Sequence, residues 1–268
     1  MCIRDSYLPI SISSTVPKKP ISYGLSIIDK LDTLVGFFLI NEKPTSSKDP
    51  FALRRSAIGL LRTIIENNLT VGLRDLIDYL IRFYTEQGVK DVNKNTHLEL
   101  INFFRDRMKN ILKEKRVRPD IIEASLSSHT NDNFLELYKK TLVMNKFISK
   151  DLGKNAVSTY KRAYNIIDRE KNISKSGPDA VLFKQDEEKE LFDKINDIRK
   201  AFTYKERKES YENHLKLLSD AKLSTDKFFD NVKVNDENND IKNNRLELLQ
   251  RLCSTFNTFI DFSKLEGS

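Results

Sequence analysis

The sequence predicts an all-α protein in two helical parts that divide near residues 130–150. Almost every segment with a clear apolar period repeats at the helical spacing of three to four residues. Clusters of proline, glycine and polar residues separate these segments, as turns do. A composition that is 39% hydrophobic and 9% aromatic favours folding over disorder. At 268 residues, the chain can bury a sizeable core without disulfides or metals.

The first part begins with a predicted helix over residues 21–40, whose apolar residues share one side. These residues are Leu25, Ile28, Leu31, Val35 and Phe38. Asp49 followed by Pro50 is typical of an N-cap and a first helical turn, so a second helix is expected to run to about Asn67. Its stripe is Ala57, Ile58, Leu61, Ile64 and Ile65. Further helices are expected near 70–86, 95–115, 119–128 and 131–149.

The second part is expected to contain helices near 154–170, 186–202, 207–221 and 241–262. The last of them has an apolar stripe at helical spacing, made of Leu249, Leu252, Cys253, Phe256, Phe259 and Ile260. The loop NDENND at 235–240 supplies side chains that can cap this helix.

Positive charge is concentrated in the middle of the chain. The whole chain has 46 basic and 39 acidic residues. Residues 101–118 hold seven basic and two acidic residues, and residues 136–175 hold ten and four. Residues 221–268 hold seven and eight. This distribution suits a polyanionic partner such as a nucleic acid, and it also suits solvated lysine-rich helix faces.

Cysteine content and hydropathy indicate a reducing, cytoplasmic location. The two cysteines, Cys2 and Cys253, make no disulfide framework and no metal-ligand spacing. The longest apolar run, at 34–40, is far shorter than the roughly 20 residues of a membrane span, so no membrane partner is expected. The segment MCIRDS at 1–6 precedes the patterned region, and we expect the natural polypeptide to begin further upstream.

Three arginines of the second helix have different predicted roles. Arg54 points into the apolar arc, and a partly buried arginine needs an anionic partner. Because Asp29 and Asp32 lie on one face of the preceding helix, we predict that Arg54 forms a structural ion pair with one of them. Arg55 and Arg62 share a polar face with Gly59 between them. The missing side chain of Gly59 would let a phosphate backbone approach these two arginines.

Catalytic and metal sites have little support in the sequence. The two aspartates could suggest acid–base catalysis or a metal, but the histidines His97, His129 and His214 are scattered. The segment KNISKSG at 171–177 resembles an ATP-phosphate loop of class I aminoacyl-tRNA synthetases, yet no βαβ pattern surrounds it. We therefore predict no catalytic residues and no metal in this chain.

Two long motifs resemble the signature of bacterial glycyl-tRNA synthetase β subunits. DKLDTLVG at 29–36 matches the family's D-K-L-D-T-L-x-G, and PTSSKDPFALRR at 44–55 matches P-T-x-x-K-D-P-F-A-L-R-R. RPDIIEASLS at 118–127 and YKRAYNII at 160–167 are similar to later family segments. KFFDNVKVN at 227–235, NNRLELLQRL at 243–252 and DFSKL at 261–265 resemble the end of the family's anticodon-binding domain.

This resemblance implies a domain organisation. Residues 1–62 would be the end of an HD-type helical domain, with residues 1–6 not native to it. Residues 63–150 would form a helical middle region, and residues 151–268 a DALR-type anticodon-binding domain. The chain would be the C-terminal part of a longer β subunit.

The resemblance also implies a function in ATP-dependent glycyl-tRNA formation. The partners would be tRNA(Gly) and the glycyl-tRNA synthetase α subunit in an α2β2 heterotetramer. The α subunit would use ATP and Mg²⁺, so this chain would bind no cofactor and catalyse nothing alone. Residues predicted to bind tRNA are Lys48, Arg55, Arg62, Tyr160, Lys161, Arg162, Asn165 and Arg245. For the tyrosines, packing in the core is the alternative.

Three other assignments stay open at this point. An anticodon-binding module of an arginyl-type synthetase would share the helical domain. A fragment of an HD-type metal phosphohydrolase would require histidines that this chain lacks, because no His-Asp dipeptide occurs in it. A structural helical protein with a basic face would bind any polyanion without preference.

Overall fold

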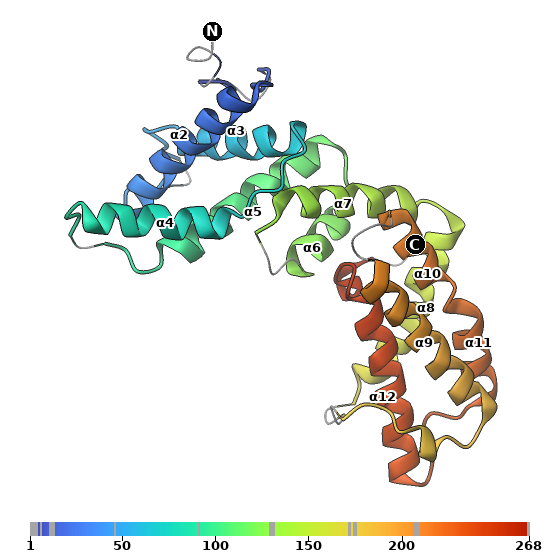
Figure 1. The fold of residues 1–268 in the computed structure, drawn as a ribbon. Coiled ribbons are helices and arrows are strands. Elements are labelled where there is room, and N and C mark those ends of the chain that lie inside the picture. Colours follow the sequence, from blue (N-terminus) through green and yellow to red (C-terminus); the bar gives the residue numbers. More distant parts are fainter. Residues whose placement is uncertain are drawn as a thin grey trace. The chain divides into compact units, whose positions relative to one another are not determined.

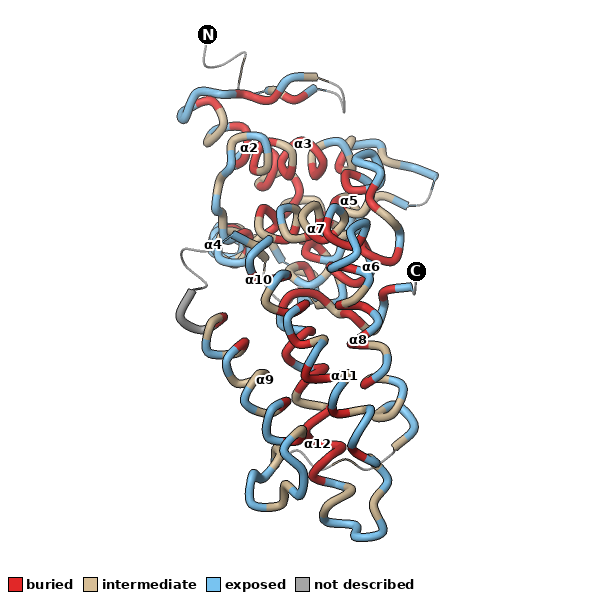
Figure 2. Tube along the Cα trace, turned by 90° about the vertical axis from the view of Figure 1, so that its right-hand side faces the viewer, coloured by how far each residue is buried: buried red, intermediate tan, exposed pale blue. Residues whose placement is uncertain are grey.

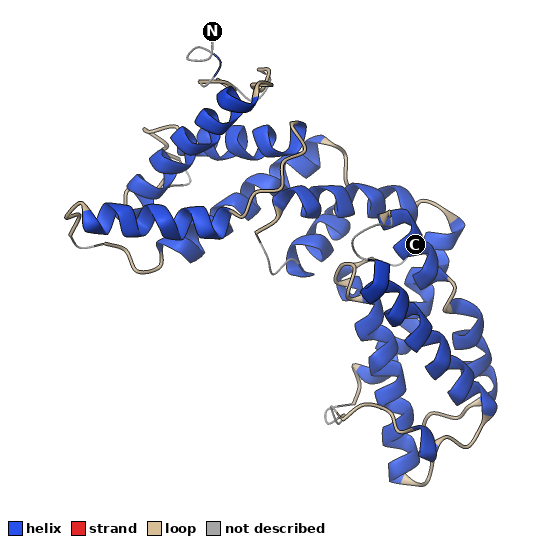
Figure 3. Ribbon diagram, viewed as in Figure 1, coloured by secondary structure: helices blue, strands red, loops and turns tan. Residues whose placement is uncertain are grey.

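The computed structural model describes residues 5, 7–10, 14–45, 47–90, 92–128, 132–170, 173, 176–205 and 210–266. Every regular element within these residues is a helix, as Figure 3 shows, so the all-α prediction is confirmed. The chain forms two compact units. Unit 1 comprises residues 1–117 with 130–139, and unit 2 comprises residues 118–129 with 140–268.

Unit 1 is built around helix α2. Its helices are α2 (Pro20–Leu39), α3 (Leu53–Glu66), α4 (Leu73–Glu86), α5 (Thr96–Glu114) and the start of α7 (Phe134–Ile148). Helix α2 packs against α3, α4 and α5, and α3 also packs against α5 (Figure 1). Leu34, Leu60 and Phe104 contribute fully buried side chains to the core between them.

The predicted apolar stripe of α2 is only partly buried. Leu31, Val35 and Phe38 lie in the core, whereas Leu25 and Ile28 are 50% and 47% exposed. The buried face is centred on Leu31 and Leu34, so the first two residues of the predicted stripe lie at its edge. The stripe of α3, in contrast, is almost entirely buried.

Helix α3 begins three residues later than predicted. Pro50 and Phe51 form a turn, and Ala52 adopts a left-handed conformation with φ of 56°. The Asp49 carboxylate nevertheless accepts hydrogen bonds from the backbone N–H groups of Leu53 and Arg54, at 2.8 and 3.1 Å. Asp49 therefore caps the helix as expected, but through the turn rather than directly before it.

Unit 2 is a helical bundle around α8 and α12. Its elements are α6 (Pro119–Ser128), the rest of α7, α8 (Asp151–Ile167), η1 (Ala180–Leu182), α9 (Asp186–Lys205), α10 (Tyr211–Ser219), α11 (Lys222–Asn231), α12 (Asn239–Phe256) and η2 (Phe262–Lys264). Helix α8 packs along α12, and α9 packs against α11 and α12. Figure 2 shows the buried residues gathered along the inner sides of these helices.

The C-terminal helix α12 ends at Phe256, six residues before its predicted end, so Phe259 and Ile260 lie beyond the helix. All six apolar residues of the predicted stripe are nevertheless buried. Asn238 caps α12 by accepting hydrogen bonds from the N–H groups of Asp240 and Ile241, at 2.9 and 3.4 Å. Burial raises the pKa of the Cys253 thiol to about 12, which favours the protonated thiol over the reactive thiolate at neutral pH. Helix α11 was not predicted.

Arg245 is a buried structural residue, which corrects its predicted role in tRNA binding. It is 4% exposed, and its guanidinium donates to Glu188 at 2.8 Å and to Asp236 at 2.8 Å. Glu188 is itself fully buried. Its second carboxylate oxygen accepts from the backbone N–H groups of Lys184 and Gln185, at 2.7 and 2.9 Å. Arg245 on α12 thereby anchors the start of α9.

Neighbouring residues of α12 hold the rest of the α8–α9 connection. Asn244 and Asp179 exchange two hydrogen bonds, of 2.7 and 3.0 Å, through the Asn244 amide and the Asp179 backbone. Glu247 accepts a hydrogen bond from the Ser176 hydroxyl at 3.1 Å. Together with the Arg245–Glu188 pair, these contacts form the α12 clamp.

We expect Arg245→Met to destabilise the chain by about 3–5 kcal/mol, because it leaves the Glu188 carboxylate buried without its charged partner. Lys242→Met is the matched control on the same helix. Lys242 pairs with Glu170 at 2.9 Å near the surface, and its loss should cost at most about 1 kcal/mol. Urea denaturation of both variants measures the difference, and equal midpoints would contradict the structural role of the buried pair.

Candidate nucleic-acid interface

The outward face of α8 presents the basic segment that the sequence singled out. Lys161 is half-buried, and Arg162 and Asn165 are exposed. Asn165 lies three and four residues after these two basic residues, which places it beside both of them on α8. Arg169, which is also exposed, lies in the turn that follows the end of α8 at Ile167. No ion pair holds Lys161 or Arg169 among the described residues. Both cations are therefore available to a ligand.

Arg162 is less available than predicted. Its guanidinium lies over the Phe229 ring at 4.4 Å from the centroid, and it pairs with Asp226 at 3.5 Å and Asp230 at 3.6 Å. Phe229 and both aspartates belong to α11. Because these ion pairs are solvent-exposed, they are weak, and a phosphate can replace the aspartates. In the unbound chain, however, Asp226 and Asp230 neutralise part of the positive charge of Arg162.

Tyr160 does not face solvent, which corrects its predicted contact with tRNA. It is 1% exposed and packs against Phe256 and Phe262, with ring centroids 5.9 and 5.6 Å away. Its hydroxyl accepts a hydrogen bond from Asn257 at 3.3 Å, and burial raises its pKa. Tyr164 stacks on it at 5.5 Å and is half-buried. The alternative of core packing therefore holds for Tyr160.

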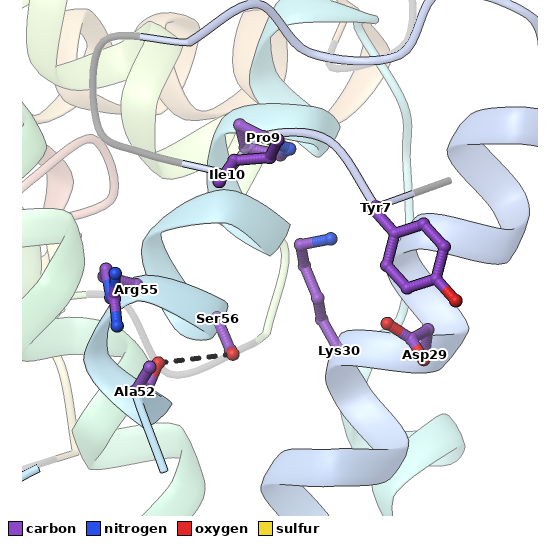
Figure 4. A pocket seen from close by; sticks show the side chains of 8 residues that line it. All are labelled: Tyr7, Pro9, Ile10, Asp29, Lys30, Ala52, Arg55 and Ser56. Carbon is purple, nitrogen blue, oxygen red and sulfur yellow. Dashed lines mark hydrogen bonds between the residues drawn. The ribbon is translucent and has the colours of Figure 1, made fainter. Parts of the chain in front are cut away.

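In unit 1, Arg55 and Lys48 remain candidates for phosphate contacts. Both side chains are exposed, and neither forms an ion pair among the described residues. Arg55 lines a pocket of about 410 Å³ between α2 and α3, with Asp29 on its opposite side (Figure 4). Ser56 also lines this pocket, and its hydroxyl donates to the Ala52 carbonyl at 3.3 Å.

Lys30 is a structural residue that sequence reasoning passed over. Its side chain is buried, and its ammonium donates to the Leu8 carbonyl at 3.0 Å and to the Ser26 hydroxyl at 2.9 Å. Burial lowers its pKa, and the neighbouring Asp29 opposes this effect. The signal that the sequence offered was the place of Lys30 within the first motif, DKLDTLVG at 29–36. Lys30 holds the segment around Pro9 against α2 and α3.

The approach to Gly59 is closed, contrary to the sequence interpretation. A Cβ atom at Gly59 would lie 3.1 Å from Lys30 Cε and 3.1 Å from Pro9 Cγ. The missing side chain therefore admits the chain's own residues rather than a phosphate backbone. Arg62 is tied to Glu66 on the same helix at 2.7 Å, which makes it a weaker candidate than Arg55.

The predicted ion pair of Arg54 with Asp29 or Asp32 does not form. Arg54 instead donates to the Thr45 carbonyl, which ties the preceding loop to α3. Asp29 is exposed, and Asp32 accepts a hydrogen bond from the Tyr84 hydroxyl at 2.9 Å. The prediction was wrong because a backbone carbonyl, which a sequence pattern does not reveal, satisfies the guanidinium.

Asp32, Gly36 and Tyr84 join α2 to α4. A Cβ atom at Gly36 would lie 3.2 Å from the Tyr84 hydroxyl oxygen, so any other residue would have to displace the Tyr84 side chain by a few tenths of an ångström. Burial and the hydrogen bond to Asp32 raise the pKa of Tyr84 to about 12. The aspartate and the glycine of the first motif thus serve helix packing.

Among the described residues, no group of three or more His, Cys, Asp or Glu side chains could hold a metal ion. His97 contacts Asp78, and His214 packs against the edge of Phe202. His129 and most of the segment KNISKSG lie outside the described residues. No helix of the described part of the chain is long and apolar enough to cross a membrane.

We expect the Tyr84 hydroxyl to stabilise unit 1 below pH 10 and to lose this effect between pH 10 and about 12. The phenol pKa is 10.0 without these contacts and about 12 with them, so the folded state holds its proton longer than the unfolded state. Comparing the denaturation of wild type and Tyr84→Phe across this range isolates the effect. Tyr79→Phe, on the exposed side of α4, is the control. A stability difference that does not change with pH would refute this assignment.

Two family models match consecutive regions of the chain. Residues 1–127 match the model described as glycyl-tRNA synthetase beta subunit. Residues 156–264 match the model described as DALR anticodon binding domain, which corresponds to most of unit 2 from α8 onward.

Similar curated proteins carry the same family name. Glycine–tRNA ligase beta subunits of Rhodospirillum centenum, Dinoroseobacter shibae and Rickettsia africae are 36%, 32% and 37% identical to this chain. The matches cover 99%, 98% and 98% of this chain, but 37%, 41% and 38% of the relatives. The chain thus spans about two fifths of their length. It belongs to the glycyl-tRNA synthetase β subunit family and carries a DALR anticodon-binding domain.

Proposed function

We propose that this chain is the C-terminal, tRNA-binding part of a glycyl-tRNA synthetase β subunit. It binds tRNA(Gly) and thereby supports ATP-dependent glycyl-tRNA formation by the α subunit. The observation that carries the proposal is the basic outward face of α8, which lies within the region that matches the anticodon-binding family.

The chemistry of that face fits a folded RNA. Lys161 on α8 and Arg169 in the turn after it supply cations that can neutralise phosphates. Such phosphate contacts position an RNA without reading its sequence. Asn165 is exposed beside them, and its amide both donates and accepts, as reading the edge of an unstacked base requires. Arg162 contributes a cation held in place on the Phe229 ring.

Unit 1 supplies a second, smaller set of contacts in this proposal. Lys48 and Arg55 are exposed and unpaired in the described structure, so they are the residues of the second motif that can reach a phosphate. Other residues of the two motifs, among them Asp32, Gly36, Asp49 and Arg54, hold the fold through the contacts described above.

The remaining partners follow from the family and stay proposals. The α subunit would bind ATP and Mg²⁺ and perform the chemistry in an α2β2 heterotetramer. This chain alone would bind no cofactor and would not aminoacylate tRNA. A cytoplasmic location, where tRNA is charged, is part of the same proposal.

We expect Lys161→Gln to weaken binding of a tRNA(Gly) transcript and to reduce the salt dependence of log K by about one unit, as loss of one phosphate contact does. Asn165→Ala should instead reduce discrimination between tRNA(Gly) and other tRNAs, with little change in salt dependence. Fluorescence anisotropy at several salt concentrations measures both effects.

Lys200→Gln is the charge-matched control. Lys200 is exposed on α9, which packs on α11 and α12. If Lys161→Gln and Lys200→Gln lose the same amount of affinity for the tRNA, only the net charge of the chain matters. That result would contradict the proposal that α8 forms the binding face.

A further inference from the structure

A groove in unit 2, lined by none of the α8 residues described above, combines aromatic rings with lysines. It has a volume of about 350 Å³ and lies between η1 and the first two turns of α9. Phe183 and Phe192 line it as an edge-to-face pair, with centroids 5.4 Å apart. Both rings are half-buried, so each packs on the bundle and also borders the groove.

The α12 clamp fixes the position of this groove. Glu188 binds the backbone of Lys184 and Gln185, which are both lining residues, and Arg245 holds Glu188 from α12. Arg251 of α12 holds the α9 side of the groove. Its guanidinium carbon lies 5.5 Å from the centroid of the Phe192 ring, and the guanidinium donates a hydrogen bond to Asn196 at 2.8 Å. The rings and the loop are therefore positioned before any ligand arrives, which lowers the entropic cost of binding.

The charged side chains around the rings offer both donors and acceptors. Lys184 and Lys189 are exposed and form no ion pair among the described residues. Asp186 and Asp193 line the same groove and are exposed acceptors. A flat aromatic ligand with an amino group and an adjoining phosphate matches this set. An unpaired nucleotide of an RNA has these parts.

We propose that the groove between η1 and α9 binds one unpaired nucleobase of the tRNA, stacked against Phe183 or Phe192. Lys184 and Lys189 contact the adjoining phosphates. Asp186 or Asp193 accepts a hydrogen bond from the exocyclic amino group of the base, which favours cytosine, adenine or guanine over uracil. This inference rests on the proposed function and adds a base-binding subsite to it.

Binding of the 268-residue chain to a tRNA(Gly) transcript tests the subsite. Transcripts in which each anticodon-loop nucleotide in turn is abasic are compared with the intact RNA. Phe183→Leu keeps an apolar side chain but removes the ring, and we expect about tenfold weaker binding of the intact RNA. Lys189→Gln should weaken it by up to about fivefold. Lys200→Gln, about three turns further along α9, should bind like wild type.

Coupling between protein and RNA changes identifies the stacked base. At one abasic position the affinity of the wild-type chain for the RNA should fall about tenfold. The affinity of Phe183→Leu should not fall further at that position, because the two changes remove the same contact. Circular dichroism confirms that each variant is folded. Lys189→Gln tests the groove independently, since an exposed lysine does not support the core.

Two results would overturn the subsite. The first is that Phe183→Leu and Lys189→Gln both bind the intact RNA with wild-type affinity. The second is that free cytidine monophosphate binds the chain as tightly as the tRNA(Gly) transcript does, which would assign the groove to a free nucleotide. If the intact RNA depends on Lys161 but not on Phe183, the subsite fails while the proposed function stands. If wild type shows no preference for tRNA(Gly) at all, the proposed function itself fails.

Discussion

The buried pair of Arg245 and Glu188 is the contact on which the arrangement of unit 2 depends. A charge pair at this depth is stable only when its remaining donors and acceptors are satisfied. Here Asp236, the Lys233 carbonyl and two backbone N–H groups at the start of α9 complete it. The ion pair therefore also fixes where α9 begins relative to α12. Because Glu188 also binds the backbone of Lys184 and Gln185, the ion pair fixes the positions of these exposed residues as well.

The two signature motifs of unit 1 act mainly through packing. Lys30 binds a backbone carbonyl, Gly36 admits the Tyr84 ring, and Arg54 binds the loop that precedes α3. Lys30 and Arg54 both donate to backbone carbonyls, and Gly36 makes room for the side chain of Tyr84. A long, specific sequence pattern can thus identify a family without marking a binding surface. Arg55 and Lys48 are the exposed exceptions.

Helix positions could be predicted from the sequence because amphipathic spacing and capping are local properties. The buried stripe of α3, and that of α12 as far as Phe256, show this directly. The roles of Tyr160 and Arg245 could not be predicted, because both depend on neighbours far along the chain, Phe262 and Glu188. Charge and aromatic content alone do not separate a buried side chain from an exposed one. Tyr160 and Arg245 are both buried by elements far away in the sequence, and this burial determines their structural roles.

Recognition of tRNA(Gly) through the anticodon-binding domain is the function that we propose for this chain. The most direct test is equilibrium binding of the 268-residue chain to a tRNA(Gly) transcript and to the same transcript with altered anticodon bases, at two salt concentrations. Phosphate contacts weaken with salt, whereas base contacts keep their discrimination. We predict a preference for the intact anticodon that persists at the higher salt concentration. Equal, weak binding of both transcripts that disappears with salt would contradict the claim.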